Sequence, residues 1–228
     1  CYHNFSPKIR SFSRRPPGRE VRLFYWHFCG AISCLGLSIN KMSTVELMEI
    51  WSKNNLEKIM TNSSWETHLG IMQIKPKYTN EGKRSVLTKF FEAKKIGDAL
   101  KPVAATSYDI EKRTPVLLTS YNDPEILAVD IGDATSAAPV YYPTAEVGDR
   151  FLIDGGIVAN HPVLHGFVEA KKLYPNNELV VLSVGTGLNK RALKGKDSTK
   201  WGLIGWMMHD LFGLMVESSM DHELAEEL

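Results

Sequence analysis

The sequence predicts a three-layer α/β fold, in which a mostly parallel sheet is flanked by helices on both faces. Short apolar segments typical of buried strands alternate along the chain with longer segments of helical character. A length of 228 residues is sufficient for one sizeable domain, and 43% hydrophobic against 23% charged residues is ordinary for a globular protein. The sequence has no internal repeat of the kind that indicates a solenoid or a repeat array.

The N-terminal segment, residues 1–29, differs in composition from the rest of the chain. In its first 20 residues five basic side chains accompany a single acid, Glu20, and Pro16-Pro17-Gly18 interrupts any helix. We therefore expect residues 1 to about 20 to be a disordered basic tail within an atypical N-terminal segment. A nucleic-acid or anionic-membrane contact of this segment is the less favoured interpretation, because its charge density is modest and the whole chain carries a net charge of only +1.

The first half of the remaining chain is expected to be largely helical. A small-residue helix is predicted from Gly30 through Leu37, and Ser43-Thr-Val-Glu46 has the spacing of a capping box that opens a helix to about Met60. Residues 61–82 are polar and rich in turn formers, which indicates a surface excursion. A further helix is predicted over residues 85–93, with its apolar side chains on one side.

The second half supplies the predicted strands. We expect strands over residues 102–110 and 115–119, and then a helix over 125–138 that packs its alanines closely. Core strands are predicted over 151–153 and 179–184, with a helix over 163–173 between them. The stretch 201–228 is rich in Met and Trp and is predicted to be helical, with core packing favoured over a lipid-facing surface.

The most informative motif is Phe151-Leu-Ile-Asp154-Gly155-Gly156, followed by a turn that ends at Pro162. Three apolar residues lead into an acid, which is typical of a buried strand that ends on a carboxylate before a turn favoured by glycine. α/β folds place their sites at the carboxyl ends of strands, so Asp154 is a candidate functional residue. The equally weighted alternative is a turn aspartate that accepts a hydrogen bond from its own backbone.

Two further blocks flank this motif. Asp133-Ala-Thr-Ser-Ala-Ala-Pro139 precedes it, and Ser183-Val-Gly-Thr-Gly187 follows it. In this order and spacing the three blocks resemble the patatin-like phospholipases, a family of lipid acyl hydrolases, and the resemblance extends from about Gly30 to the C-terminus. It implies a patatin-type α/β fold, a lipid or phospholipid ester as substrate, and neither a metal ion nor an organic cofactor.

The resemblance also implies a serine–aspartate dyad. Members of the family carry the nucleophile on a G-x-S-x-G turn between a strand and a helix, and a glycine-rich loop supplies N–H groups to the oxyanion. By resemblance Asp154 is the base of the dyad, and Gly155 and Gly156 complete its motif. The sequence contains no G-x-S-x-G, and aligning the last glycine of that turn with Gly30 places Phe28 at the expected position of the serine. The glycine-rich oxyanion loop is missing as well.

No other residue is a convincing substitute for the missing nucleophile. Cys29 lies one position away, Ser33 and Ser38 fall inside or after the first predicted helix, and Ser136 belongs to a block suited to helix packing. A metal site is not favoured either. The four-residue spacing of His161 and His165 fits one helix face, but Pro162 lies between them and no third ligand is evident.

The genetic code offers an explanation for the missing motif. Codons for Tyr25-Trp-His-Phe-Cys29, shifted by one base, permit Gly-Thr-Ser followed by Ala or Val, and a single missing base would bring Gly30 back in frame. We therefore hypothesise that residues 1–29 are translated out of frame, with a genuine disordered segment as the alternative. Residues 30–228 then form a patatin-like domain that is incomplete at its N-terminus, and a missing C-terminal part is left open.

Two functional classes remain for the chain. The first is a lipid or phospholipid acyl hydrolase domain that lacks its nucleophile as written, and the second is an inactive lipid- or partner-binding pseudoenzyme. A cytoplasmic protein is expected, because no signal peptide and no run of about 18 apolar residues is present. Peripheral contact with a membrane is left open, and a nucleic-acid partner is not expected.

Overall fold

The computed structural model describes residues 24–26, 28–62, 75–158, 163–183 and 195–202, together with residues 205, 206, 211 and 214. The elements follow in the order β1 (Phe24–Trp26), α1 (Phe28–Ile39), α2 (Thr44–Ile50), α3 (Lys53–Ile59), α4 (Asn80–Phe91), η2 (Ile96–Asp98), β2 (Val103–Asp109), β3 (Thr114–Thr119), α5 (Ala128–Thr135), β4 (Ala145–Val147), β5 (Arg150–Asp154), η3 (Gly155–Ile157), α6 (Val163–Leu173) and α7 (Gly195–Ser198).

The sheet of the described residues is mixed, and strand β2 is its centre. β2 pairs in parallel with β1 and antiparallel with β3 and β5, and β4 pairs antiparallel with β5. The expectation of a mostly parallel sheet is therefore wrong for the described strands, although the α/β class is confirmed. The reason is the length of the connections, because only four residues join β2 to β3 and only two join β4 to β5. Such connections form hairpins and are too short for a parallel crossover.

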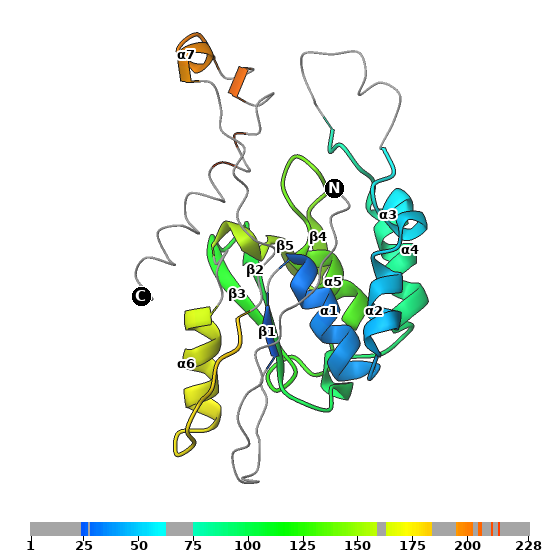
Figure 1. Ribbon diagram of the computed structural model, residues 1–228, viewed down its shortest axis with the longest axis vertical. Coiled ribbons are helices and arrows are strands. Elements are labelled where there is room, and N and C mark those ends of the chain that lie inside the picture. Colours follow the sequence, from blue (N-terminus) through cyan, green and yellow to red (C-terminus); the bar gives the residue numbers. More distant parts are fainter. Residues whose placement is uncertain are drawn as a thin grey trace.

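Helices pack against the sheet from two sides. Helix α1 contacts β1 and β2, and α5 contacts β2, β4 and β5. Helix α6 also contacts β1, which lies between α1 and α6 in Figure 1. The core forms where α1 and α5 pack against β2 and where α4 packs against α1 and α5, and its fully buried side chains include Leu35, Phe91, Val103, Leu118 and Ile131.

Most predicted helices are present with shifted ends. The predicted helix from Ser43 is divided into α2 and α3, because the chain turns at Trp51 and Ser52. Its capping box is confirmed, since the Ser43 N–H donates to Glu46 Oε2 (2.7 Å) and the Glu46 N–H donates to Ser43 Oγ (3.3 Å). Helix α6 occupies the predicted range, whereas α5 is shorter than expected.

The predicted core strand at 179–184 is not a strand over its described residues, 179–183. Val180 and Leu182 are 71% and 77% exposed, so this apolar run is not part of the core. The Gly-Thr-Gly turn after Ser183 and most of the stretch 201–228 lie outside the described residues. None of the described helices combines the length and the hydropathy needed to cross a bilayer.

Candidate active site

Asp154 is the last residue of β5, and its side chain is buried. Only 4% of the residue is exposed, and its carboxylate oxygen Oδ1 accepts the Gly156 N–H at 2.8 Å. The Asp154 N–H in turn donates to the Ala137 carbonyl at 3.1 Å. The hydrogen bond from Gly156 is the one that a turn aspartate would make, but turn aspartates are usually solvated and Asp154 is not.

The carboxyl end of β1 meets the carboxyl end of β5 on one edge of β2. Ala105 pairs with Trp26 and with β3, and Ser107 pairs with Asp154 and with β3. A strand has only two edges, so β1 and β5 lie end to end on the edge opposite β3. Because each residue advances a strand by about 3.3 Å, the Cα atoms of Trp26 and Asp154 are separated by about 7 Å along that edge.

A strand–helix junction therefore lies beside Asp154. Strand β1 ends at Trp26, and α1 begins two residues later at Phe28. A turn between a strand and a helix is the geometry that exposes the nucleophile of G-x-S-x-G hydrolases. Strand β1 and helix α1 form a junction of this kind, and Phe28 is the first residue of α1.

Burial makes the carboxyl group of Asp154 a weaker acid than usual, because its pKa is raised. Removal from water raises the pKa of its carboxyl group to about 7, and the hydrogen bond from Gly156 and the positive charge of Lys83 only partly oppose this effect. A general base works best when its pKa is close to the ambient pH. Asp154 is therefore suited to exchanging protons near neutrality.

Gly155 is required by close packing. A Cβ atom at this position would lie 2.3 Å from the Thr106 carbonyl oxygen and 2.4 Å from Thr106 Oγ1. Both distances are far below any van der Waals contact, and the carbonyl is held by the Thr135 hydroxyl at 2.8 Å. The turn after Asp154 can approach β2 this closely only because Gly155 has no side chain.

We therefore expect Gly155→Ala to destabilise the protein by about 1–3 kcal/mol, the usual range for forced overpacking. The measurement is urea unfolding followed by circular dichroism. Gly148→Ala is a poor control, because Gly148 has a positive φ of 63°. Gly202→Ala is the better one, because nothing lies within 4 Å of its added Cβ. Equal stability of both variants would contradict the packing argument.

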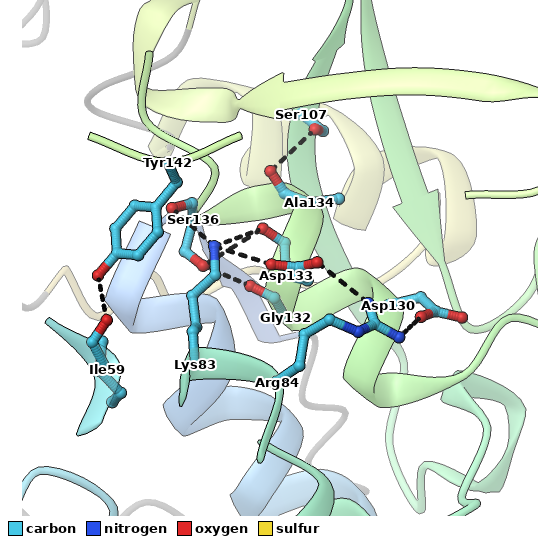
Figure 2. Close-up of polar contacts among 10 residues, drawn as sticks. All are labelled: Ile59, Lys83, Arg84, Ser107, Asp130, Gly132, Asp133, Ala134, Ser136 and Tyr142. Atoms are coloured by element: carbon cyan, nitrogen blue, oxygen red, sulfur yellow. Dashed lines mark hydrogen bonds and ion pairs between the residues drawn. The ribbon is translucent and has the colours of Figure 1, made fainter. Parts of the chain in front are cut away.

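A buried ion pair lies next to the site, at the carboxyl end of α5 (Figure 2). The Lys83 ammonium lies 2.9 Å from Asp133 Oδ1, and both side chains are 3% exposed. Arg84 binds the other carboxylate oxygen of Asp133 at 3.0 Å and Asp130 at 2.7 Å. Lys83 also donates to the carbonyls of Asp133 (3.2 Å) and Ser136 (3.3 Å), and lies 4.1 Å from the centroid of the Tyr142 ring.

Sequence inspection did not single out Lys83, although a signal was present. Lys83 precedes the buried residues Val86 and Leu87 by three and four positions, so it lies on the buried side of α4. A lysine there requires a partner, and Asp133 in the adjoining small-residue helix is that partner.

Three serines were candidates to replace the missing nucleophile, and none of them lies in an exposed turn between a strand and a helix. Ser33 lies within α1 and accepts a hydrogen bond from Trp51 Nε1, and Ser38 is buried in the same helix. Ser136 donates to the Gly132 carbonyl at 2.6 Å, as expected for a packing residue. His161 lies outside the described residues, and those that the structure describes contain no cluster of three or more potential metal ligands.

Comparison with known proteins shows the family of the chain. The family model described as patatin-like phospholipase matches residues 29–166, which is more than half of the chain. The chain belongs to this family. The matched region contains α1 from Cys29 onward, the sheet from β2 onward, Lys83, Asp133 and the Asp154-Gly155-Gly156 motif.

Three patatin-like relatives illustrate the range of the family. The chain is 30% identical to a cGAMP-activated phospholipase of Pseudomonas aeruginosa (strain BWHPSA011 / Pa011), over 94% of this chain and 67% of the relative. It is 29% identical to Patatin-like protein 1 of Arabidopsis thaliana, over 64% of this chain and 43% of the relative. A protein called Probable inactive patatin-3-Kuras 1, of Solanum tuberosum, is 30% identical over 60% of this chain and 45% of the relative. The chain thus spans less than half the length of the two plant relatives.

Proposed function

We propose that this chain is a lipid or phospholipid acyl hydrolase domain whose general base is Asp154. The observation that carries this proposal is the meeting of two carboxyl strand ends on one edge of β2. There the buried last residue of β5, Asp154, lies beside a strand–helix junction. Membership of the patatin-like phospholipase family supports an ester of a lipid as the substrate. Peripheral contact with a membrane surface would give access to such a substrate.

The proposed chemistry is acyl transfer to a serine at position 28. Asp154 accepts the proton of the serine hydroxyl while Oγ attacks the ester carbonyl carbon. The tetrahedral intermediate collapses as the ester C–O bond breaks, and the proton passes from Asp154 to the leaving alcohol. Water then attacks the acyl-enzyme, with Asp154 again accepting a proton, and the fatty acid and free serine are released.

The chain as written cannot complete this cycle. Phenylalanine at position 28 has no nucleophilic atom that could attack an ester. We propose that residues 1–29 are translated out of frame and that the patatin-like domain comprises residues 30–228. The start of the family-model match at Cys29 supports this boundary, whereas the alignment with the Pseudomonas aeruginosa relative covers 94% of the chain and therefore includes part of residues 1–29. The pairing of Phe24–Trp26 with β2 favours the alternative for these three residues, namely that they are a genuine part of the sheet.

The second candidate function is that of an inactive lipid- or partner-binding module. It is favoured by Phe28 and by the existence of a relative whose name includes the words "probable inactive". On this alternative the chain retains the fold of a hydrolase and binds acyl chains or a partner without turnover.

The coding DNA across codons 18–32 decides first between these functions. An extra base that gives Gly-Thr-Ser-Ala-Gly or Gly-Thr-Ser-Val-Gly would establish a damaged copy of a hydrolase gene. Trp-His-Phe-Cys-Gly as written would favour the binding module.

Hydrolysis of a short p-nitrophenyl ester tests the role of Asp154. We expect background rates for the chain as written and for Phe28→Ser, because a serine alone restores neither the turn nor the oxyanion donors. A variant with Trp26→Gly, His27→Thr, Phe28→Ser and Cys29→Ala should show slow turnover, which Asp154→Asn abolishes. Turnover that survives Asp154→Asn would contradict the dyad. Asp154-dependent turnover by the chain as written would contradict its inactivity.

A further inference from the structure

Lys83 is bound to the carboxyl end of α5 by more than its ion pair. Its ammonium donates to the carbonyls of Asp133 and Ser136, which belong to the last turn of that helix and to its C-cap. Carbonyls at the end of a helix lack intrahelical donors and carry partial negative charge, so a cation is favourable there. The Tyr142 ring at 4.1 Å covers the ammonium from another direction.

The same end of α5 holds Asp154. Ala137, the residue after Ser136, accepts the Asp154 N–H through its carbonyl at 3.1 Å. The Ser107 hydroxyl lies 3.4 Å from the Ala134 carbonyl (Figure 2). It also donates to the Ile153 carbonyl at 2.6 Å, which ties the residue before Asp154 to the helix. The end of α5 therefore links Lys83 to β5. Lys83 binds the carbonyls of Asp133 and Ser136, and the carbonyls of Ala134 and Ala137 contact Ser107 and Asp154.

Lys83 is also the nearby positive charge that acts on Asp154. Its charge favours the carboxylate and partly offsets the burial that raises the pKa of Asp154. Glu146 on β4 is exposed, and several other charged side chains on elements packed against β5 have partners of their own. Asp109 accepts the Glu111 and Lys112 amides, Asp130 binds Arg84, Asp133 binds Lys83 and Arg84, and Arg150 lies 3.6 Å from Asp123.

We propose that Lys83 is a positioning residue for Asp154, through the carbonyls at the end of α5 and through its own positive charge. This inference rests on the proposed role of Asp154 as base. In this role Lys83 acts through the end of α5 and through its charge, and takes no part in the bond-making steps. Without Lys83 the base would be less well placed and less readily ionised.

Titration of Asp154 by carbon-13 NMR tests the proposal, with the Asp154→Asn spectrum identifying the carboxyl signal. We expect Lys83→Met to move the titration midpoint upward by about one pH unit, because a cation that favours the carboxylate is lost. Exchange of the Asp154 amide hydrogen should become about tenfold faster, since its acceptor Ala137 is less well held. Lys83→Arg should retain most of the original midpoint.

Lys89→Met is the matched control, because Lys89 lies on the same helix but is exposed and binds Glu49. Lys83→Gln replaces Lys83→Met if the latter does not fold, because the glutamine amide donates to the same carbonyls without a charge. A folded Lys83→Met or Lys83→Gln variant with the original midpoint would overturn the proposal. The titration does not require turnover, so this failure is distinguishable from loss of Asp154-dependent hydrolysis in the serine-restored protein.

Discussion

Asp154→Asn is expected to make the protein more stable at alkaline pH and to leave its stability unchanged at pH 3. The carboxyl group has an ordinary pKa of 3.8, and burial in the folded state raises it to about 7. Since one pKa unit corresponds to about 1.4 kcal/mol, the expected gain at pH 8 is about 4 kcal/mol. Asparagine keeps the oxygen that accepts the Gly156 N–H and has no charge to bury.

The direction follows from which state holds the proton. Between pH 3.8 and about 7 the unfolded chain has lost the Asp154 proton while the folded protein still holds it, so the wild-type protein loses stability as the pH rises. Below this interval both states are protonated and above it both are ionised, so the difference from the asparagine variant is constant there. The difference should therefore grow only within the interval.

Urea unfolding of both proteins at pH 3, 5, 7 and 9 measures this difference. Asp149→Asn is a suitable control, because Asp149 is exposed in the turn between β4 and β5 and should change stability by less than about 0.5 kcal/mol. A constant difference between Asp154→Asn and wild type at all four pH values would contradict the effect of burial. If Asp154→Asn stabilises the protein, Asp154 itself lowers the stability of the wild-type protein. This cost is typical of residues that are retained for function.

Local signals in the sequence predicted single elements better than they predicted the sheet. The capping box at Ser43, the helix over 163–173 and the strand that ends at Asp154 are all set by neighbouring residues. The mixed sheet depends instead on the connections. Only four residues connect β2 to β3, and only a short turn at Gly148 connects β4 to β5. Both connections are too short for a parallel crossover, and their lengths can be read from the sequence.

The part of the candidate site that local sequence determines could also be predicted. Asp154 could be recognised because its motif is contiguous, with an apolar strand before it and two glycines after it. The close approach of Gly155 to Thr106 and the partners of Lys83 involve residues about 50 positions apart. Such contacts depend on how α4, α5 and β2 pack, and a charged residue among apolar ones only indicates that some partner exists.

Asp133→Asn is expected to destabilise the protein by about 3 kcal/mol. The change leaves the Lys83 ammonium buried without its carboxylate, and breaking a buried ion pair from one side costs about 3–5 kcal/mol in other proteins. The lower end of this range is expected, because the carbonyls of Asp133 and Ser136 and the Tyr142 ring still contact the ammonium. Arg84 is 38% exposed and should turn toward water and Asp130 at little cost.

Asp130→Asn is the matched control for this prediction, and urea unfolding at pH 7 is the measurement. It removes a carboxylate from the same helix and the same network, but its ion pair with Arg84 is partly exposed and should contribute less than about 1 kcal/mol. Equal losses for the two variants would contradict the dominance of the buried pair. The double variant Lys83→Met with Asp133→Leu should recover most of the loss, because no charge is then left buried without a partner. Recovery of stability without recovery of the Asp154 titration midpoint would separate the contribution of Lys83 to folding from its effect on the base.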